Sequence, residues 1–176
     1  MMFKAISATT FFLLAMSIPI KTQADWMYSS WGSSLAQLIE AAKPYEGVTS
    51  VDDVVATPFG ELAASAKHED LGLEGIAFFA FKEGKLSAVL FTPAGFNQEL
   101  LLTRLVGRYG APIQRPAPGD FIKQTWLWRD EDNGNMVSYS HFPAALVQDQ
   151  VTYMPIDANP APRNRVQPVS EAISDN

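Results

Sequence analysis

Residues 129–136 read Arg-Asp-Glu-Asp-Asn-Gly-Asn-Met and gather acidic and amide side chains around one glycine. Such a run could hold a calcium ion, supply catalytic carboxylates or form a turn. A calcium loop of the EF-hand kind that starts at Asp130 would place Gly134 at a ligand position and His141 where a glutamate is needed. The sequence therefore argues against a calcium loop and favours a turn in water.

The strand-like residues on both sides of this run predict a β-hairpin. Residues 133–134 (Asn-Gly) are the favoured pair for a type I′ turn. Folding the chain about them places Trp128 opposite Tyr139 and Trp126 opposite His141, so that the aromatic rings share one face. The acidic residues then lie at the tip because the tip is exposed to solvent.

Three other groups contain the residue types that acid–base or metal chemistry uses. Residues 68–70 (His-Glu-Asp) are consecutive and cannot easily converge, so we interpret them as a solvated loop. The pair 52–53 (Asp-Asp) is typical of helix-capping charge. His141 could pair with Asp149 or a serine, as in a hydrolase, but the chain has no Gly-x-Ser-x-Gly motif. We therefore expect no enzymatic activity, no metal and no cofactor.

An aromatic set is the most suggestive feature of the chain. Its members are Trp26, Tyr28, Trp31, Trp126, Trp128 and Tyr139, with His141 at the end of the same face. One interpretation places these residues in the core. The other makes them a binding surface, because tryptophan and tyrosine are favoured anchors of protein interfaces and could also stack on sugars.

Two helices are predicted by spacing and by their end signals. Ser34 with Gln37 fits a capping box, and apolar residues at helical spacing follow it, so the first helix spans 34–43. Asn97 caps a second helix over 98–109, and Gly110 stands at its stop position.

Apolar runs at 76–81 and 86–91 flank a Lys-Glu-Gly-Lys turn and predict a hairpin. Both faces of its strands are apolar, so the strands are either covered on both sides or meet a partner on one face. Further strands are expected over 61–67, 124–129, 135–141 and 146–154, whereas 44–60 fits a strand or a helical turn. This order predicts an α+β fold in which two helix-plus-antiparallel-strands units form one sheet with the helices packed on one face.

The two ends of the chain differ from its middle. Lys4, the apolar stretch 5–20 and the small residues before Asp25 predict a secretory signal peptide over 1–24. The run is short for a membrane span, so we expect no transmembrane anchor in the mature chain. Residues 25–156 are predicted to form a single domain and 157–176 a disordered tail.

Composition narrows the classes of function. The chain has no cysteine, which excludes disulfides, thiol catalysis and zinc–thiolate sites. Removing Lys4 and Lys21 with the signal leaves 11 basic and 19 acidic residues, a net charge of about −8. That balance argues against nucleic acid as a partner.

Three short motifs carry a resemblance that covers about 31–153. They are Trp-Gly-Ser-Ser at 31–34, Phe-Lys-Glu-Gly-Lys-Leu at 81–86 and Tyr-Gly-Ala-Pro at 109–112. In these motifs the chain resembles small bacterial secreted domains of unknown function. Its order of elements is also similar to the fold of the β-lactamase inhibitory protein and of the small lipoprotein of the outer-membrane assembly machinery, although their cysteines are missing here. The resemblance implies protein binding without catalysis.

The function predicted from the sequence is therefore an exported, periplasmic or secreted, protein-binding inhibitor or adaptor with a partner in the cell envelope. A periplasmic glycan or small-ligand binder that uses Trp26, Trp31, Trp126 and Trp128 is the first alternative. A hydrolase that uses His141 is the second.

Overall fold

The computed structural model describes residues 25–45, 47–95, 98–144 and 148–158, and it shows an α+β protein dominated by one antiparallel sheet. In chain order the elements are β1 (Asp25–Trp26), β2 (Ser29–Ser30), α1 (Leu35–Ala42), β3 (Thr49–Thr57), β4 (Gly60–Asp70), β5 (Leu73–Lys82), β6 (Lys85–Pro93), α2 (Gln98–Tyr109), β7 (Gln124–Asp130), β8 (Asn135–His141), β9 (Gln150–Pro155) and the 3₁₀ turn Ile156–Ala158. The expected α+β class with one antiparallel sheet is confirmed.

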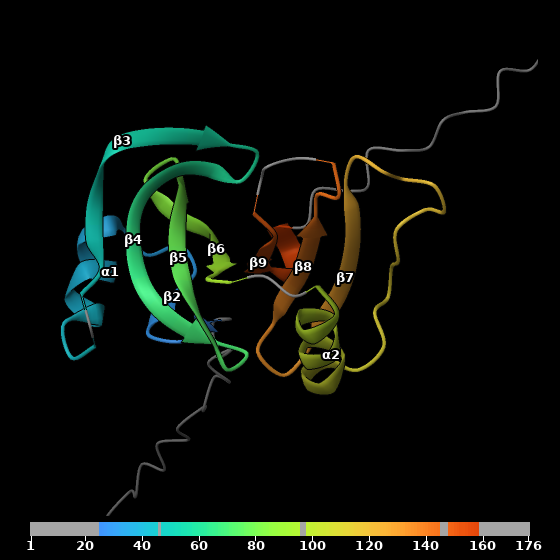
Figure 1. The fold of residues 1–176 in the computed structure, drawn as a ribbon. Helices are drawn as coiled ribbons and strands as arrows, with labels where there is room; N and C mark the ends of the chain where they lie inside the picture. Colours follow the sequence, from blue (N-terminus) through green and yellow to red (C-terminus); the bar gives the residue numbers. More distant parts are fainter. Residues whose placement is uncertain (1–24, 46, 96–97, 145–147, 159–176) are drawn as a thin grey trace, which may run out of the picture.

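Seven strands form the sheet in the order β3-β4-β5-β6-β9-β8-β7. Figure 1 shows that the sheet is strongly curved, with β3 and β4 arching over one end. The last strand of the chain, β9, pairs between β6 and β8, so both halves of the sequence join in one sheet, as expected.

Both predicted helices form. Ser34 accepts the backbone N–H of Gln37, while the Gln37 side chain accepts the backbone N–H of Ser34, which confirms the capping box. The second helix has the predicted bounds, 98–109. Its predicted cap, Asn97, lies outside the described residues.

The expected layer of helices over one face of the sheet is wrong. Figure 1 shows α1 beside β3 and β4 and α2 near β7, toward opposite ends of the sheet. The main contacts of α1 are with β2, and those of α2 are with β7. Each helix buries two residues in the main core, as Leu38, Ala42, Leu101 and Leu105. The two halves are also unequal, because the first contributes β3 to β6 to the main sheet and the second only the shorter strands β7 to β9.

The strands correct several predicted boundaries. The ambiguous stretch 44–60 contains β3, and the strand predicted over 61–67 extends to Asp70. Residues 68–70 therefore belong to a strand, and the predicted solvated loop is wrong. Asp52 and Asp53 lie in an irregular bulge of β3, between Ser50 and Val55, where its pairing with β4 shifts register, instead of capping a helix.

The β5–β6 hairpin forms as predicted. Lys82 pairs with Lys85, which leaves a two-residue loop. Both loop residues, Glu83 and Gly84, have positive φ angles of 54° and 73°. This geometry matches a type I′ turn, in which glycine accepts the left-handed conformation without strain.

The acidic run 129–136 is a turn, as predicted, but its register differs by two residues. Trp126 pairs with Tyr139, and Asp130 pairs with Asn135, so four residues form the loop instead of two. The Asp130 carboxylate accepts the backbone N–H and the side-chain amide of Asn133. Asn133 has no positive φ angle, so the predicted type I′ pair is wrong.

Both faces of the sheet bury apolar residues, as expected for its central strands. The larger cluster contains Phe79, Phe91, Val137 and Tyr153, and the smaller one on the other face contains Leu90, Met136 and Met154. The last strand begins at Gln150, later than predicted, and the 3₁₀ turn includes the first two residues of the expected tail. The signal segment 1–24 and residues 159–176 lie outside the described residues.

Candidate functional site

Most of the predicted aromatic set is core. Trp26, Trp31, Trp128 and Tyr139 are at most 5% exposed, whereas Tyr28, Trp126 and His141 are partly buried. The Nε1–H of Trp31 donates to Asn135 Oδ1 at 2.8 Å, and that of Trp128 donates to the Gly110 carbonyl at 3.0 Å. Buried side chains with satisfied polar groups offer no contact area, so the four buried rings cannot form the predicted binding surface.

The predicted pairing of His141 with Asp149 is present. Nδ1 of His141 lies 2.8 Å from Asp149 Oδ1, and the Tyr139 hydroxyl donates to the same carboxylate. Trp126 stacks on Tyr139 with ring centroids 5.2 Å apart. The His141 and Asp149 side chains are only 14% and 4% exposed, so this cluster supports the end of β8 and offers little access to a substrate.

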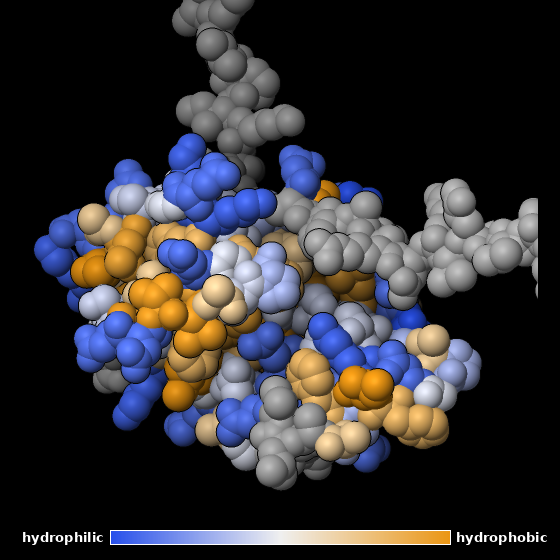
Figure 2. Space-filling view, turned by 90° about the horizontal axis from the view of Figure 1, so that it is seen from above, coloured by the Kyte–Doolittle hydropathy of each residue, from blue (hydrophilic) through white to orange (hydrophobic). Residues whose placement is uncertain are grey.

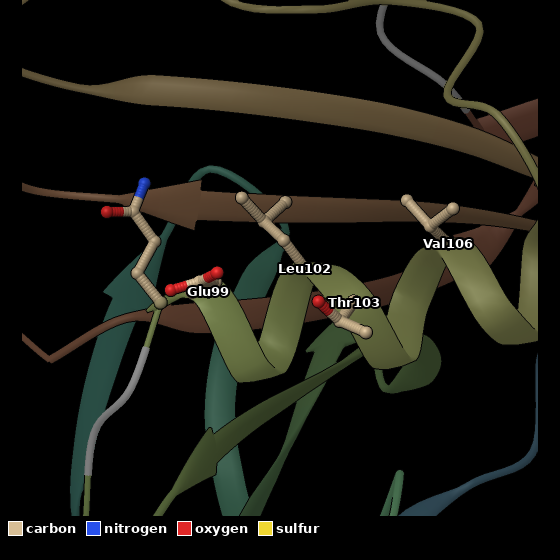
Figure 3. Close-up of a pocket in the computed structure, with 5 residues that line it drawn as sticks. Glu99, Leu102, Thr103 and Val106 are labelled. Carbon is tan, nitrogen blue, oxygen red and sulfur yellow. The ribbon is translucent and has the colours of Figure 1, made fainter.

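A groove of about 430 Å³ runs along α2. All five residues that line it, Gln98, Glu99, Leu102, Thr103 and Val106, belong to that helix. Figure 3 shows Leu102 and Val106 pointing to the same side of the helix and Thr103 pointing away from them. Because a single element supplies every lining residue, the groove lacks the convergent groups of a binding site.

A second cavity, of about 370 Å³, lies where four segments meet. It is lined by residues of the β1–β2 turn, the end of β4, the end of α2 and the β7–β8 turn, together with Tyr153. The buried Asp70 carboxylate accepts the Leu71 backbone N–H at 2.8 Å, Arg108 Nη1 at 2.9 Å and the Tyr153 hydroxyl. These groups are engaged with one another, so we interpret the network around Asp70 as structural.

Burial dominates the ionisation of this network. Burial raises the pKa of Tyr109 to about 12 and that of Tyr153 well above its ordinary value of 10.0. The neighbouring Asp70 charge raises both further. Both phenols therefore stay neutral across the physiological range, and the Tyr153 hydroxyl joins β9 to Asp70 at the end of β4.

A larger hollow, of about 620 Å³, adjoins this cavity and is mainly apolar. Ten residues line it, and we refer to it as the hairpin hollow: Met27, Tyr28, Tyr45, Lys67, His68, Glu69, Glu74, Gly75, Ile76 and Ala94. Its volume falls within the range of ligand pockets, about 300–1,000 Å³. Met27, Tyr45 and Ile76 are 57%, 57% and 44% exposed. Three large apolar side chains around one opening are unusual unless they meet a partner.

Local geometry explains why these side chains stand out. Trp26 pairs with Ser29, so Met27 and Tyr28 form a tight loop, which the buried Trp26 anchors to Phe79 and Tyr153. Met27 has a φ angle of 55°, a conformation that costs a non-glycine residue about 1 kcal/mol or more. Tyr28 stacks on Tyr45 with ring centroids 5.0 Å apart. The hairpin thus holds an apolar side chain outward at a conformational cost.

His68 lies at the wall that the hollow shares with the polar cavity. Its ring contacts Trp26 edge-on, with centroids 5.1 Å apart, and its buried Nε2 has no hydrogen-bond partner. Burial lowers the pKa of His68, while the charges of Asp70 and Glu69 partly oppose that effect. The imidazole is therefore neutral at pH 7, which suits an apolar hollow.

Among the residues that line the hairpin hollow, the sequence predicted only Tyr28 as a binding residue. Tyr45 belongs to the stretch 44–60, for which the sequence fits either a strand or a helical turn, and Met27 lies between the aromatic residues Trp26 and Tyr28. The signal that could have indicated the site was Ile76. This apolar residue lies on the same face of β5 as the exposed Glu74, where a polar residue is expected.

The described ranges contain neither a cluster suited to a metal ion nor a helix suited to cross a membrane. Within them, no group of three or more histidine, aspartate or glutamate side chains is placed to hold a metal ion. Neither described helix has the length and apolar character of a membrane span. No known protein family, curated protein or solved structure matches the chain.

A second apolar group lies on another part of the surface. Figure 2 looks down on the molecule from above the view of Figure 1. Apolar side chains gather among hydrophilic ones in its left half, which is the side of β3 and β4. Val54 and Val55 of β3 are each 54% exposed. Neither lines any of the hollows described above, so this group serves best as a control surface.

Proposed function

We propose that this chain is an exported, non-enzymatic protein that binds a partner polypeptide in the cell envelope through the hairpin hollow. The observation that carries the proposal is the group of Met27, Tyr45 and Ile76, each about half exposed around a 620 Å³ opening. Methionine and aromatic residues are enriched at protein interfaces, where an anchor residue of one partner fills a pocket of the other.

The shape of the opening favours a protein partner. A small-ligand pocket buries most of its ligand within its walls. Here the apolar side chains form an exposed rim, which would pack around an inserted side chain and gain burial themselves. The open face of Tyr45 also supports a glycan as a second candidate, since its other face is covered by Tyr28.

Export is part of the proposal. The first 24 residues carry the signal pattern, and β1 begins at Asp25, so cleavage before this residue leaves every described element intact. The resemblance to small bacterial secreted domains of unknown function supports the same compartment. Sequencing the N-terminus of the protein isolated from cells should give Asp-Trp-Met-Tyr, whereas an intact Met1 would contradict the proposal.

Affinity capture from an envelope extract tests the site with matched variants. The test variant combines Tyr45→Ser with Ile76→Ser, and its control combines Val54→Ser with Val55→Ser, which removes apolar side chains of similar exposure. We expect one stoichiometric protein to be retained by the native chain and by the control, and to be lost from the test variant. Thermal melting of all three proteins checks that each is folded.

Two results would contradict the proposal. One is retention of the same protein by the test variant, which would place the contact elsewhere. The other is retention of envelope glycan with no protein, which would favour the second candidate. Variants of Trp126 or Trp128 are poorer probes, because Trp128 is buried and its loss would perturb the core.

A further inference from the structure

We propose that the partner segment carries a basic side chain two residues from its apolar anchor, and that Glu69 and Glu74 receive this basic group. The inference rests on the proposed function, since it names the chemistry of the segment that would enter the hairpin hollow. It is drawn from a feature of the sheet that stability alone does not explain.

That feature is a pair of like charges directly opposite each other. Glu69 of β4 pairs with Glu74 of β5 in the antiparallel register, so their side chains share one face of the sheet. Both side chains are exposed, and both line the hairpin hollow. Like charges at directly opposed positions destabilise a sheet, and such local conflicts are expected at functional sites.

The two cations near Glu69 and Glu74 form no ion pair with either carboxylate. Lys67 lines the same hollow two cross-strand pairs away, opposite Ile76. Among the ion pairs of the described residues, none joins Lys67 to either glutamate. Arg108, the cation of the adjoining cavity, is paired with Asp70 at 2.9 Å. The charged side chains that line the hollow are therefore one cation and two carboxylates, because the His68 imidazole is neutral.

The spacing of these groups defines the partner's motif. Ile76, at the apolar rim, and Glu74 stand two residues apart on one face of β5, about 6.6–6.8 Å along the strand. Residues i and i+2 of an extended segment have the same separation. A segment that inserts an apolar side chain beside Ile76 would place its i+2 side chain over the two glutamates, where lysine or arginine would be attracted and aspartate or glutamate repelled.

Peptide titration followed by amide NMR tests this inference. The probes are acetyl-Ala-Leu-Ala-Lys-Ala-amide and the same peptide with norleucine in place of lysine, which keeps the apolar stem and removes the charge. Shifts of the Tyr45, Gly75, Ile76 and Ala94 amides report occupancy of the hollow. We expect the lysine peptide to bind at least about 5-fold more tightly, and 0.5 M salt to remove that advantage.

A charge-matched pair of variants assigns the effect to its residues. Glu69→Gln with Glu74→Gln should bring the lysine peptide to the affinity of the norleucine peptide. Asp52→Asn with Asp53→Asn changes the net charge equally on the exposed bulge of β3 and should leave the 5-fold preference intact. Equal loss in both variants would assign the preference to the overall charge and overturn the inference.

The remaining outcomes separate this inference from the function it rests on. If both peptides shift the amides of the hollow with equal affinity, the docking site stands and the basic motif is wrong. If the norleucine peptide binds more tightly, the motif is also wrong. If neither peptide shifts these amides, the hollow does not accept an apolar side chain, and both proposals fail.

Discussion

Met27 combines a strained backbone conformation with an exposed apolar side chain. Its φ angle of 55° suits glycine, yet a methionine side chain stands there, 57% exposed. We predict that Met27→Gly raises the free energy of unfolding by up to about 1 kcal/mol, because the strain of the left-handed conformation disappears. The same change should weaken partner capture, since the rim of the hairpin hollow loses an apolar side chain. Chemical denaturation and affinity capture measure the two effects, and a variant that loses stability while keeping its partner would contradict the prediction.

Asp70 and Glu69 are neighbours with opposite roles. The Asp70 carboxylate is buried and holds Leu71, Arg108 and Tyr153, whereas Glu69 is exposed. We predict that Asp70→Ala lowers the free energy of unfolding by about 3 kcal/mol, since it leaves buried donors without an acceptor. Glu69→Ala should change it by no more than about 0.5 kcal/mol. Urea titration of both variants checks this, and equal effects would remove the structural role assigned to Asp70.

For single residues, the sequence predicted contacts between side chains better than it predicted which side chains are exposed. The His141–Asp149 pair was one of the two pairings that the sequence indicated for His141, and it forms where the end of β8 meets the residue just before β9. Exposure depends on what covers a side chain, and Trp26 is covered by Phe79 and Tyr153, residues 53 and 127 positions away in the sequence. Spacing along one strand carries no information about such distant neighbours.

Helices, strands and turns were predictable where contacts between residues close in the sequence determine the structure. The capping box at Ser34 and the glycine turn at Gly84 use contacts within four residues, and both form as expected. The register of the β7–β8 hairpin was wrong because the Asp130 carboxylate binds Asn133 and stabilises a longer loop than the Asn-Gly pair indicates. The end of β4 was missed because pairing with β5 supports a segment whose composition alone suggests a loop.

Two glycines should respond in opposite ways to a methyl group. A Cβ atom at Gly75 of β5 would lie 2.4 Å from the Thr92 carbonyl oxygen and 2.6 Å from the Phe91 ring, whereas one at Gly107 of α2 would meet nothing within 4 Å. We predict that Gly75→Ala destabilises the protein by about 2 kcal/mol or more through overpacking, and that Gly107→Ala stabilises it by about 0.5–1 kcal/mol through helix propensity. Thermal unfolding of the two variants tests the placement of β5 against β6, and stabilisation by both would contradict it.

The whole molecule is a curved sheet that buries residues on both faces. Because several of the buried residues are tyrosines, this arrangement determines how the stability of the fold changes at alkaline pH. Burial raises the pKa of Tyr109 to about 12 and raises those of Tyr139 and Tyr153, while the unfolded chain ionises near 10.0. Stability is therefore complete below about pH 10 and is lost as the pH rises from 10 towards 12, because only the unfolded chain releases these protons.

We predict that the urea midpoint falls steeply between pH 10 and pH 12. Tyr109→Phe should make this fall shallower, since one buried phenol no longer opposes ionisation. Tyr45→Phe, at a 57% exposed position, should leave the slope unchanged. A slope that is equal in all three proteins would show that the buried tyrosines do not control alkaline unfolding.

The architecture as a whole was predicted only in outline. Alternating helices and strand blocks indicate an α+β fold with one sheet, and that part holds. The helices were misplaced because amphipathic spacing identifies the buried face of a helix without identifying what covers it. The hairpin hollow arises where the β1–β2 turn, Tyr45 and the β4–β5 pair meet, a junction that only the tertiary arrangement creates.

Site-specific photo-crosslinking in cells tests the hairpin hollow most directly. A benzoylphenylalanine introduced at Ile76, 44% exposed on the rim, is compared with one at Val54, 54% exposed on β3. Binding through the hollow predicts one discrete adduct at position 76 that is absent at position 54 and is suppressed by Tyr45→Ser. An adduct of equal yield at position 54, or none at position 76 in cells that contain the partner captured biochemically, would contradict it.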